Sequence, residues 1–254
     1  MKIFVLCILY LLLTACSTVP HRIPSSKQKR LLVFGKSNRP AHMHIVPGAI
    51  THLVRHFQQN GFEAVGSQEL ISLTKESLSS FDGIVFVDVS NGILNDEHKN
   101  AVEEFVSQRK GLLLIHASIA AGNDWRWLKE MIGTSFLDHP PIQQAKVSLT
   151  TNDQHTVIRL PDVWSQSDEW YNFTSKIGDD FSILATVDES SYLGGKMGNH
   201  PITWSRKDLK QKVWFTAMGH EESLYAEYEA PFMKHILNAA LWATSSFEQQ
   251  GTTD

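Results

Sequence analysis

Two apolar segments decide the fold: GIVFVD at residues 83–88 and GLLLIH at residues 111–116. Each begins with glycine, continues without polar alternation, and ends on a side chain that can carry chemistry, Asp88 or His116. Strands that are apolar on both sides are typical of a parallel sheet with helices on both faces. Between the two segments, Asn95 precedes an amphipathic stretch, which predicts a capped helix. Together they predict a β-α-β unit.

The same alternation continues on both sides of this unit. Upstream, the sequence predicts a strand at 31–34, a helix opened by Pro47 and closed by Gly61, and a short strand at 63–65. Downstream, strands are predicted at 145–149, 182–187 and 213–217, then a terminal helix at 232–242 with Leu241 facing inward. The pattern predicts one flavodoxin-like α/β domain, with a mostly parallel sheet, helices on both faces and a loop-rich second half.

The amino terminus has the pattern of a bacterial lipoprotein signal peptide. An apolar run at 3–13 follows Lys2 and is too short for a bilayer, whose core is about 30 Å thick. It ends in LTAC at 13–16, which resembles a lipobox with Cys16 as the lipidated residue. The alternative is an uncleaved anchor with a chance cysteine. The lipobox predicts an extracytoplasmic, lipid-anchored protein. Because the residue after Cys16 is serine and not aspartate, we expect it at the periplasmic face of the outer membrane in a double-membrane bacterium.

The sequence predicts a signal peptide (1–16), a flexible tether (17–29), a folded domain (30–245) and a polar tail (246–254).

The net charge is -4 with interspersed signs, so no basic stripe indicates nucleic-acid binding. Both cysteines of the chain, Cys7 and Cys16, precede the folded domain. This domain therefore has no thiol nucleophile, no disulfide and no cysteine metal ligand.

Histidines follow three of the predicted strands. His42 and His44 come after the first strand, His116 directly ends the strand at 111–115, and His220 follows the strand at 213–217. Ligands of such sheets bind beyond the carboxyl ends of the strands. Because imidazole can move protons or bind metal near neutral pH, these positions predict an active site at that edge.

Four blocks of sequence, in order, resemble the ThuA-like (trehalose utilisation) family. The first contains His116-Ala117, Asp124-Trp125 and His139-Pro140; the others are DEWYNF at 168–173, the segment 194–204, and FTAMGH at 215–220. The resemblance covers 31–242 and implies a class I glutamine amidotransferase-like fold with a role in carbohydrate utilisation, including keto sugars. One departure is the first loop, AHMH at 41–44, which lacks the arginine usual in the family. His44 is the best match to the family histidine.

The resemblance and the strand ends together give three sets of candidate residues. His116 takes the position of an amidotransferase cysteine, which excludes glutaminase chemistry. The candidate catalytic residues are His116, His220, Asp168 and Glu169. The candidate ligands of a divalent metal, Zn²⁺ or Mn²⁺, are His44, His116 and His220. The candidate substrate-binding residues are Asp124, Trp125, His139, Trp170, Tyr171, His200 and Trp204.

Each candidate also has a structural alternative. If Asp168 and Glu169 are extended, they point to opposite faces, so one faces the pocket and the other orients a partner. The aromatic residues either stack on a sugar or belong to the core. Asp124 either caps a helix beginning at Trp125 or binds sugar hydroxyls. Any of the histidines can instead hydrogen-bond within its own loop.

The favoured function is an enzyme that acts on a glycoside or keto-glycoside as a hydrolase, lyase or isomerase. Its chemistry would be acid–base catalysis by histidine and carboxylate, or metal-assisted catalysis. The competing function is a non-catalytic carbohydrate-binding lipoprotein that uses the same residues. In both cases the partners are a small carbohydrate and, through the lipid anchor, a membrane.

Overall fold

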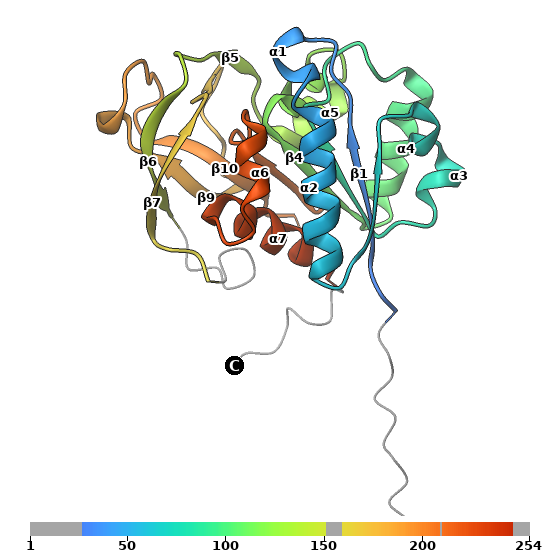
Figure 1. The fold of residues 1–254 in the computed structure, drawn as a ribbon. Helices are drawn as coiled ribbons and strands as arrows, with labels where there is room; N and C mark the ends of the chain where they lie inside the picture. Colours follow the sequence, from blue (N-terminus) through green and yellow to red (C-terminus); the bar gives the residue numbers. More distant parts are fainter. Residues whose placement is uncertain (1–26, 151–158, 209, 246–254) are drawn as a thin grey trace, which may run out of the picture.

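The computed structural model describes residues 27–150, 159–208 and 210–245, and its centre is a nine-stranded sheet (Figure 1). The strand order is β2-β1-β3-β4-β11-β10-β9-β6-β7. The first five are β2 (Glu63–Ser67), β1 (Arg30–Gly35), β3 (Gly83–Val87), β4 (Gly111–Ile115) and β11 (Val213–Thr216). The other four are β10 (His200–Arg206), β9 (Phe181–Val187), β6 (Gln143–Leu149) and β7 (Val163–Asp168). A separate pair consists of β5 (Phe136–Asp138) and β8 (Asn172–Phe173).

The strands from β2 to β11 form the predicted parallel sheet. Every residue of β3 and of β4 is buried, as their continuous apolar sequences require. The glycines that begin these strands have a packing reason. A side chain at Gly111 would collide with Ala243 of the terminal helix, and one at Gly83 with Leu31. The missing side chain at Gly111 therefore lets this helix approach the sheet closely.

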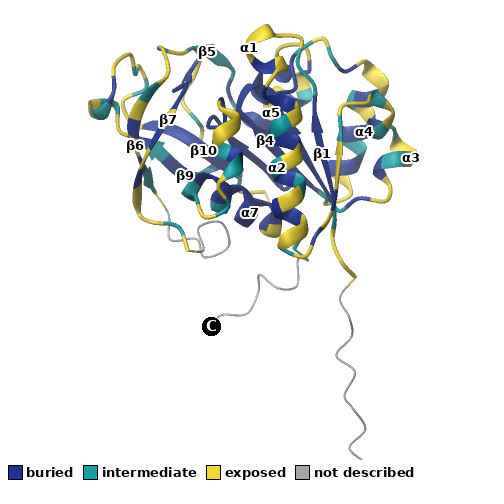
Figure 2. Ribbon diagram, viewed as in Figure 1, coloured by how far each residue is buried: buried dark blue, intermediate teal, exposed yellow. Residues whose placement is uncertain are grey.

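The helices cover both faces of the parallel half, as predicted. Helix α2 (Val46–Gln59) connects β1 to β2, and helix α4 (Asp96–Ser107) connects β3 to β4. These two connections step in opposite directions across the sheet, so right-handed crossovers place the two helices on opposite faces. Helix α3 (Lys75–Leu78) packs on α4. Helices α6 (Glu222–Ala226) and α7 (Pro231–Thr244) lie with α2 (Figure 1). Figure 2 shows that α2 is buried toward the sheet and exposed on its outer side.

Two details of the helices bear on the expectations from sequence. The Asn95 side chain accepts a hydrogen bond from the amide of His98 at 3.0 Å, so the predicted cap of α4 is confirmed. Leu241 in α7 is 46% exposed, so the expectation that it faces inward is wrong. Within the described ranges, no helix is both long and apolar enough to cross a membrane.

The second half of the sheet is antiparallel, from β11 through β10, β9 and β6 to β7. Each antiparallel step reverses direction, so β7 runs the same way as β4 and β11. The carboxyl ends of these three strands therefore share one edge of the sheet. Asp168, the last residue of β7, accepts a hydrogen bond from the Gly219 amide beyond β11 at 2.8 Å. This half of the sheet must curl to bring the two strand ends together.

His235 in α7 is an unusual core residue. It is fully buried, and neither ring nitrogen has a hydrogen-bond partner among the described residues. Its ring lies edge-on to Trp214, with the ring centroids 5.3 Å apart. Burial lowers the pKa of His235 to about 4, from the value of 6.5 that a free imidazole has.

We expect His235→Leu to increase stability, and to increase it more in acid. The neutral form is buried without partners, which costs about 1–3 kcal/mol even at pH 8. Between pH 6.5 and 4 the unfolded chain binds a proton that the folded chain excludes, so stability falls by up to about 3 kcal/mol as pH drops. Urea unfolding from pH 8 to pH 4 should show a shallower decline in the variant. An unchanged pH profile, or the same change in exposed His44→Leu, would contradict this account.

Candidate functional site

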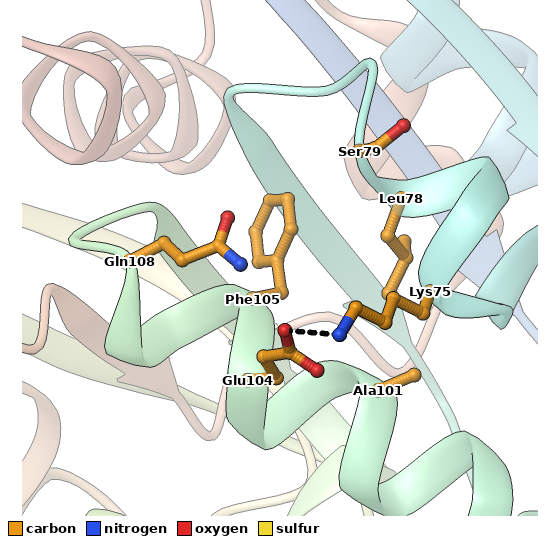
Figure 3. Close-up of a pocket in the computed structure, with 7 residues that line it drawn as sticks. All are labelled: Lys75, Leu78, Ser79, Ala101, Glu104, Phe105 and Gln108. Carbon is orange, nitrogen blue, oxygen red and sulfur yellow. Dashed lines mark ion pairs between the residues drawn. The ribbon is translucent and has the colours of Figure 1, made fainter.

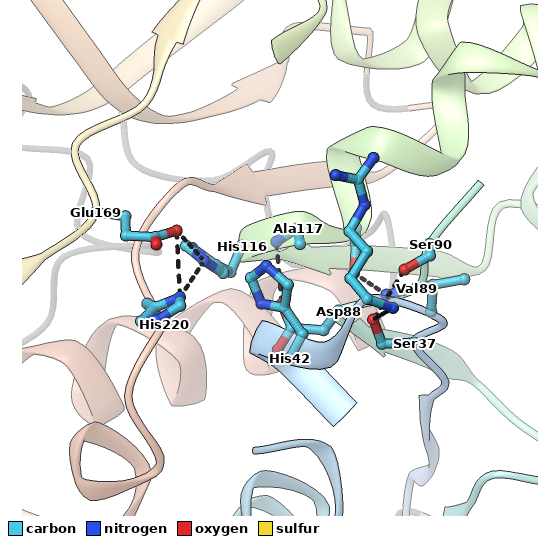
Figure 4. A network of polar contacts seen from close by, with 12 residues as sticks. Ser37, His42, Asp88, Val89, Ser90, His116, Ala117, Glu169 and His220 are labelled. Atoms are coloured by element: carbon cyan, nitrogen blue, oxygen red, sulfur yellow. Dashed lines mark hydrogen bonds and ion pairs between the residues drawn. The ribbon is translucent and has the colours of Figure 1, made fainter. Parts of the chain in front are cut away.

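A buried cluster of three histidines and one carboxylate lies at the carboxyl edge of the sheet: His42, His116, Glu169 and His220 (Figure 4). One potential ligand atom from each residue lies within 4.8 Å of those of the others. The four come from separate segments: α1 (Pro40–Met43), the turn after β4, the residue after β7, and the loop after β11. The cluster could hold a metal ion.

The turn after β4 fixes how His116 faces the cluster. His116 directly follows the strand and has a left-handed backbone with φ of 51°, a conformation that residues other than glycine seldom adopt. Its Nδ1 lies 2.7 Å from the carbonyl oxygen of Ala217, and a carbonyl can only accept. Nδ1 therefore carries a proton, and in the neutral ring the free lone pair is on Nε2, which faces the cluster.

Three ligand atoms form a close triangle. His116 Nε2 lies 3.2 Å from His220 Nδ1 and 3.4 Å from Glu169 Oε2, and His220 Nδ1 lies 3.2 Å from Glu169 Oε2. Ligands of a tetrahedral zinc ion, bound at about 2.1 Å, are separated from each other by about 3.4 Å. The ring of His42 completes the arrangement, with its centroid 5.2 Å from those of both other histidines. The donor set and its spacing therefore fit a divalent metal with nitrogen and oxygen ligands.

The charges in the cluster are strongly coupled. Burial alone would raise the pKa of Glu169, but hydrogen bonds with His116 and His220 outweigh it and hold the pKa well below its usual range. Burial would lower the pKa of His116, yet Glu169, Asp88 and Asp168 raise it to about 9. Burial and the two neighbouring histidines lower the pKa of His42 to about 3. At neutral pH and without metal, His116 is therefore doubly protonated, whereas His42 is neutral. Binding of a metal cation would displace the second proton, on Nε2 of His116.

The adjacent carboxylates Asp168 and Glu169 have different partners. Asp168 is fully buried and accepts hydrogen bonds from the amides of Gly219 and His220, at 2.8 and 3.1 Å. Burial raises the pKa of Asp168. Glu169 instead turns toward His116 and His220. As expected for consecutive extended residues, one carboxylate faces the site and the other orients the loop that carries His220.

Asp88 binds the backbone amide that follows His116. In enzymes with a nucleophile on such a turn, the amide after the nucleophile helps to bind the oxyanion. Here the amide of Ala117 donates to Asp88 Oδ1 at 3.1 Å. Burial raises the pKa of Asp88 to about 6. The amide that could serve as an oxyanion donor on this turn is therefore already engaged by Asp88.

The cluster is least buried at His42, His220 and Glu169, whose side chains are 9%, 10% and 11% exposed. The side chain of His116 is fully buried. His139 is the most open neighbour, with its side chain 34% exposed and its Nε2 3.6 Å from Glu169 Oε1. The hydroxyl of Tyr171 lies 2.8 Å from His116 Nε2. His139 and Tyr171 therefore border the cluster, although Tyr171 itself is only 3% exposed.

The structure corrects the prediction for His44. This residue is exposed at the end of α1, and its Nδ1 lies 3.4 Å from the carbonyl oxygen of Pro40. His42, two residues earlier, turns inward and takes the expected place in the cluster. The reason is that Pro40 opens a short helix, so the loop that carries both histidines is not extended.

Three tryptophans and one histidine proposed to bind substrate lie in the core instead. The indole nitrogens of Trp125, Trp170 and Trp204 donate to Glu103 Oε1, the carbonyl of Gln143 and the carbonyl of Ile132, respectively. All three tryptophans are at least 96% buried, although the remaining exposed edge of Trp125 lines a surface pocket beside Asp124. The ring of His200 is also buried, with Nε2 2.8 Å from the carbonyl oxygen of Tyr171. For these residues the structural alternative holds.

Asp124 also lies apart from the cluster. It does not cap α5 (Arg126–Ile132), whose amino end has no side-chain cap. Its carboxylate accepts from the amide of Gly92 at 2.9 Å and pairs with Lys99 at 3.4 Å. Asp124 therefore joins the loops after β3 and β4, and the expectation of a helix cap is wrong.

A pocket between α3 and α4 is separate from the cluster (Figure 3). Its lining residues are Lys75, Leu78, Ser79, Ala101, Glu104, Phe105 and Gln108. An ion pair joins Lys75 and Glu104 there at 2.6 Å, with the Lys75 side chain largely exposed and that of Glu104 about half buried. The lining contains none of the residues singled out from the sequence.

Comparisons with known proteins agree with this architecture. The chain is similar to a ThuA-like protein from Bacteroides uniformis, with a TM-score of 0.73 and 20% identity over 86% of this chain and 93% of that one. A ThuA-like protein from Parabacteroides merdae gives a TM-score of 0.65 and 15% identity over 85% and 88%. A protein described as part of a GMP synthase from Thermoplasma acidophilum gives 0.56 and 15% over 89% and 100%. At these identities the likeness shows the fold, a class I glutamine amidotransferase-like α/β domain.

No curated protein matches the chain in sequence. The family model described as "Trehalose utilisation", ThuA, matches residues 30–243, which is most of the chain and all of the strands described above. The chain therefore belongs to the ThuA family.

Proposed function

We propose that this protein is an enzyme of carbohydrate utilisation, and that its active site is a divalent metal centre formed by His42, His116, Glu169 and His220. The observation that carries the proposal is the triangle of ligand atoms at 3.2–3.4 Å, which matches the ligand spacing of tetrahedral zinc. Three imidazoles with one carboxylate suit Zn²⁺ better than Mg²⁺ or Ca²⁺, which prefer oxygen ligands. The family supplies the substrate class, a carbohydrate.

The surrounding residues would bind the substrate and move protons. When bound, a divalent cation would polarise a carbonyl oxygen or activate a water molecule. His139 lies beside Glu169 with its side chain 34% exposed, so its ring is placed to contact a substrate, and its Nδ1 donates to the carbonyl of Pro140 at 2.8 Å. Burial raises the pKa of Tyr171 well above its usual value, so its hydroxyl stays neutral beside the cluster. These groups suit hydrolysis, elimination or isomerisation of a glycoside or keto-glycoside.

The burial of the tryptophans weighs against a non-catalytic sugar-binding protein. Such a protein would offer an open aromatic face for stacking, whereas Trp125, Trp170 and Trp204 are all committed to the core. The groups that meet at the candidate site are titratable instead. This distribution supports catalysis over capture.

Elemental analysis and a substrate screen test the proposal together. Protein purified without chelator should contain about one equivalent of zinc or manganese, and removal by chelation should abolish turnover of disaccharides or their 3-keto forms. Adding Zn²⁺ or Mn²⁺ back should restore it. A protein that binds neither ion has no such metal centre. One that binds a sugar and the metal but turns over nothing in the screen is a binding protein.

We also propose that the chain is exported and anchored by lipid at Cys16. The lipobox pattern supports this, although it lies outside the described residues. Residue 30 begins β1 at the amino end of the parallel strands, and the cluster lies at their carboxyl ends. A tether before β1 therefore joins the molecule at the edge opposite the candidate site.

Cys16→Ser should abolish incorporation of labelled palmitate and release the protein from the membrane fraction. The reason is that a hydroxyl cannot form the thioether that carries the lipid. Metabolic labelling followed by fractionation measures both effects, and Cys7→Ser serves as the control. Persistent labelling of the Cys16 variant would show that the lipobox interpretation is wrong.

A further inference from the structure

Asp88 contacts the cluster without belonging to it. Its side chain is fully buried directly after β3, and Oδ1 lies 3.6 Å from Nδ1 of His42 (Figure 4). That imidazole nitrogen is buried and has no hydrogen-bond partner among the described residues, and the same is true of Asp88 Oδ2. Buried polar atoms are nearly always hydrogen-bonded, so two such exceptions on facing side chains require an explanation.

The same carboxylate is also joined to the turn that carries His116. Strands β3 and β4 are neighbours, with Val87 opposite Ile115, and the residue after each has φ of 51°. Asp88 Oδ1 accepts from the amide of Ala117 at 3.1 Å. The hydroxyl of Ser118 accepts from the amide of Val89 at 3.2 Å, which holds the two turns together. The position of Asp88 is therefore fixed by the backbone on both sides.

A small movement of His42 toward Asp88 Oδ1 would give its unpaired ring nitrogen a hydrogen-bond acceptor. Histidine ligands of metals commonly donate their second ring N–H to a carboxylate, which sets the tautomer and aims the other nitrogen at the metal. Nδ1 of His42 faces Asp88, so Nε2 is the atom left to face the cluster. Closing the gap from 3.6 Å to a hydrogen-bond distance needs less than one ångström.

We propose that Asp88 is a positioning residue of the metal centre, whose carboxylate accepts the Nδ1 proton of His42 and thereby presents Nε2 as a ligand. This inference rests on the proposed metal centre and assigns to Asp88 no contact with substrate. The geometry gives the neighbouring Asp168 a parallel task at a different ligand, because its carboxylate holds the backbone amide of His220. The two buried aspartates therefore make a matched pair for an experiment.

A double-mutant cycle on Zn²⁺ affinity tests the inference. The dissociation constant is measured for the full chain, Asp88→Asn, His42→Ala and the double variant, by competition with a chromophoric chelator and Zn²⁺ alone. Asp88→Asn keeps an acceptor for the Ala117 amide but removes the charge. It should weaken binding about 10- to 100-fold in the wild-type background. With His42 already replaced, the same change should weaken binding less than about threefold, because Asp88 acts through His42.

Asp168→Asn provides the control, since it should have the same effect with or without His42. Thermal melting of each metal-free variant shows whether it folds. The tautomer of His42 in the zinc-loaded wild-type protein, read by long-range ¹H–¹⁵N NMR, requires no variant and should show protonated Nδ1. A wild-type protein that binds no zinc overturns both the metal centre and this inference. If the protein binds zinc but the effects of Asp88→Asn and His42→Ala on affinity are additive, or if His42 binds zinc through Nδ1, the role of Asp88 is overturned and the metal centre stands.

Discussion

Replacing His116 with alanine is expected to remove zinc binding and to lower turnover by about 10² to 10⁴. Its Nε2 is one corner of the ligand triangle and lies 2.8 Å from the hydroxyl of Tyr171. The substitution also removes one of the two histidines that contact Glu169 Oε2. Zinc content by elemental analysis, and steady-state rates on the sugar found in the screen, measure the two effects.

A matched pair of histidines controls for nonspecific damage to this region. Loss of a residue that only supports a metal ligand typically weakens binding about 10- to 100-fold. Because His42 is itself a proposed ligand, His42→Ala should weaken zinc binding by more than this. His44→Ala, two residues away and exposed, should leave zinc content and rate unchanged. If His44→Ala lost the metal and His42→Ala retained it, the assignment of the ligands would be wrong.

Sequence reasoning predicted the part of the site that depends on strand ends. Continuous apolar strands indicated a parallel sheet, and that alone placed His116 and His220 at one edge, where their ring nitrogens now lie 3.2 Å apart. The same reasoning listed both His42 and His44 after β1, and it preferred His44 from the family pattern. The choice depended on the short helix opened by Pro40, whose four residues are too few for hydrophobic periodicity to reveal.

The antiparallel half was harder to predict for a physical reason. In β7 the inward positions include the polar side chains of Gln166 and Asp168, so burial does not follow hydrophobicity. β10 begins with His200 and Pro201 and carries Thr203 and Ser205 inward, so it lacks a continuous apolar run. These polar groups are satisfied by contacts between distant segments, such as that of Asp168 with Gly219. A local pattern cannot predict such contacts.

The aromatic residues show a second limit of local sequence. A tryptophan that stacks on sugar and one that fills a core look the same in sequence, because both present a large apolar ring with one donor. What distinguishes them is the partner of the indole N–H. Trp170 and Trp204 each donate to a main-chain carbonyl from another segment, at 2.8 and 2.9 Å, which ties them to the fold.

Trp204→Ala is therefore expected to destabilise the protein by about 3–5 kcal/mol while leaving the intrinsic sugar affinity of the folded fraction unchanged. The ring of Trp204 is 1% exposed and contacts Phe173 and Phe215, at centroid distances of 5.2 and 4.5 Å. Its removal leaves a cavity and an unpaired carbonyl at Ile132. Denaturant unfolding measures the loss of stability, and calorimetry at low temperature measures affinity.

Trp127 is the matched control, because it is only partly buried and packs at the edge of the core. Trp127→Ala should lower stability much less, since less apolar surface is lost from contact with the core. A Trp204→Ala protein that unfolds like the wild type yet binds sugar at least tenfold more weakly would reverse this assignment. The aromatic residue would then contact the carbohydrate, and the sugar-binding function would regain its support. The expected result is the opposite, because Trp204 of β10 packs against Phe215 of β11 and donates to the carbonyl of Ile132.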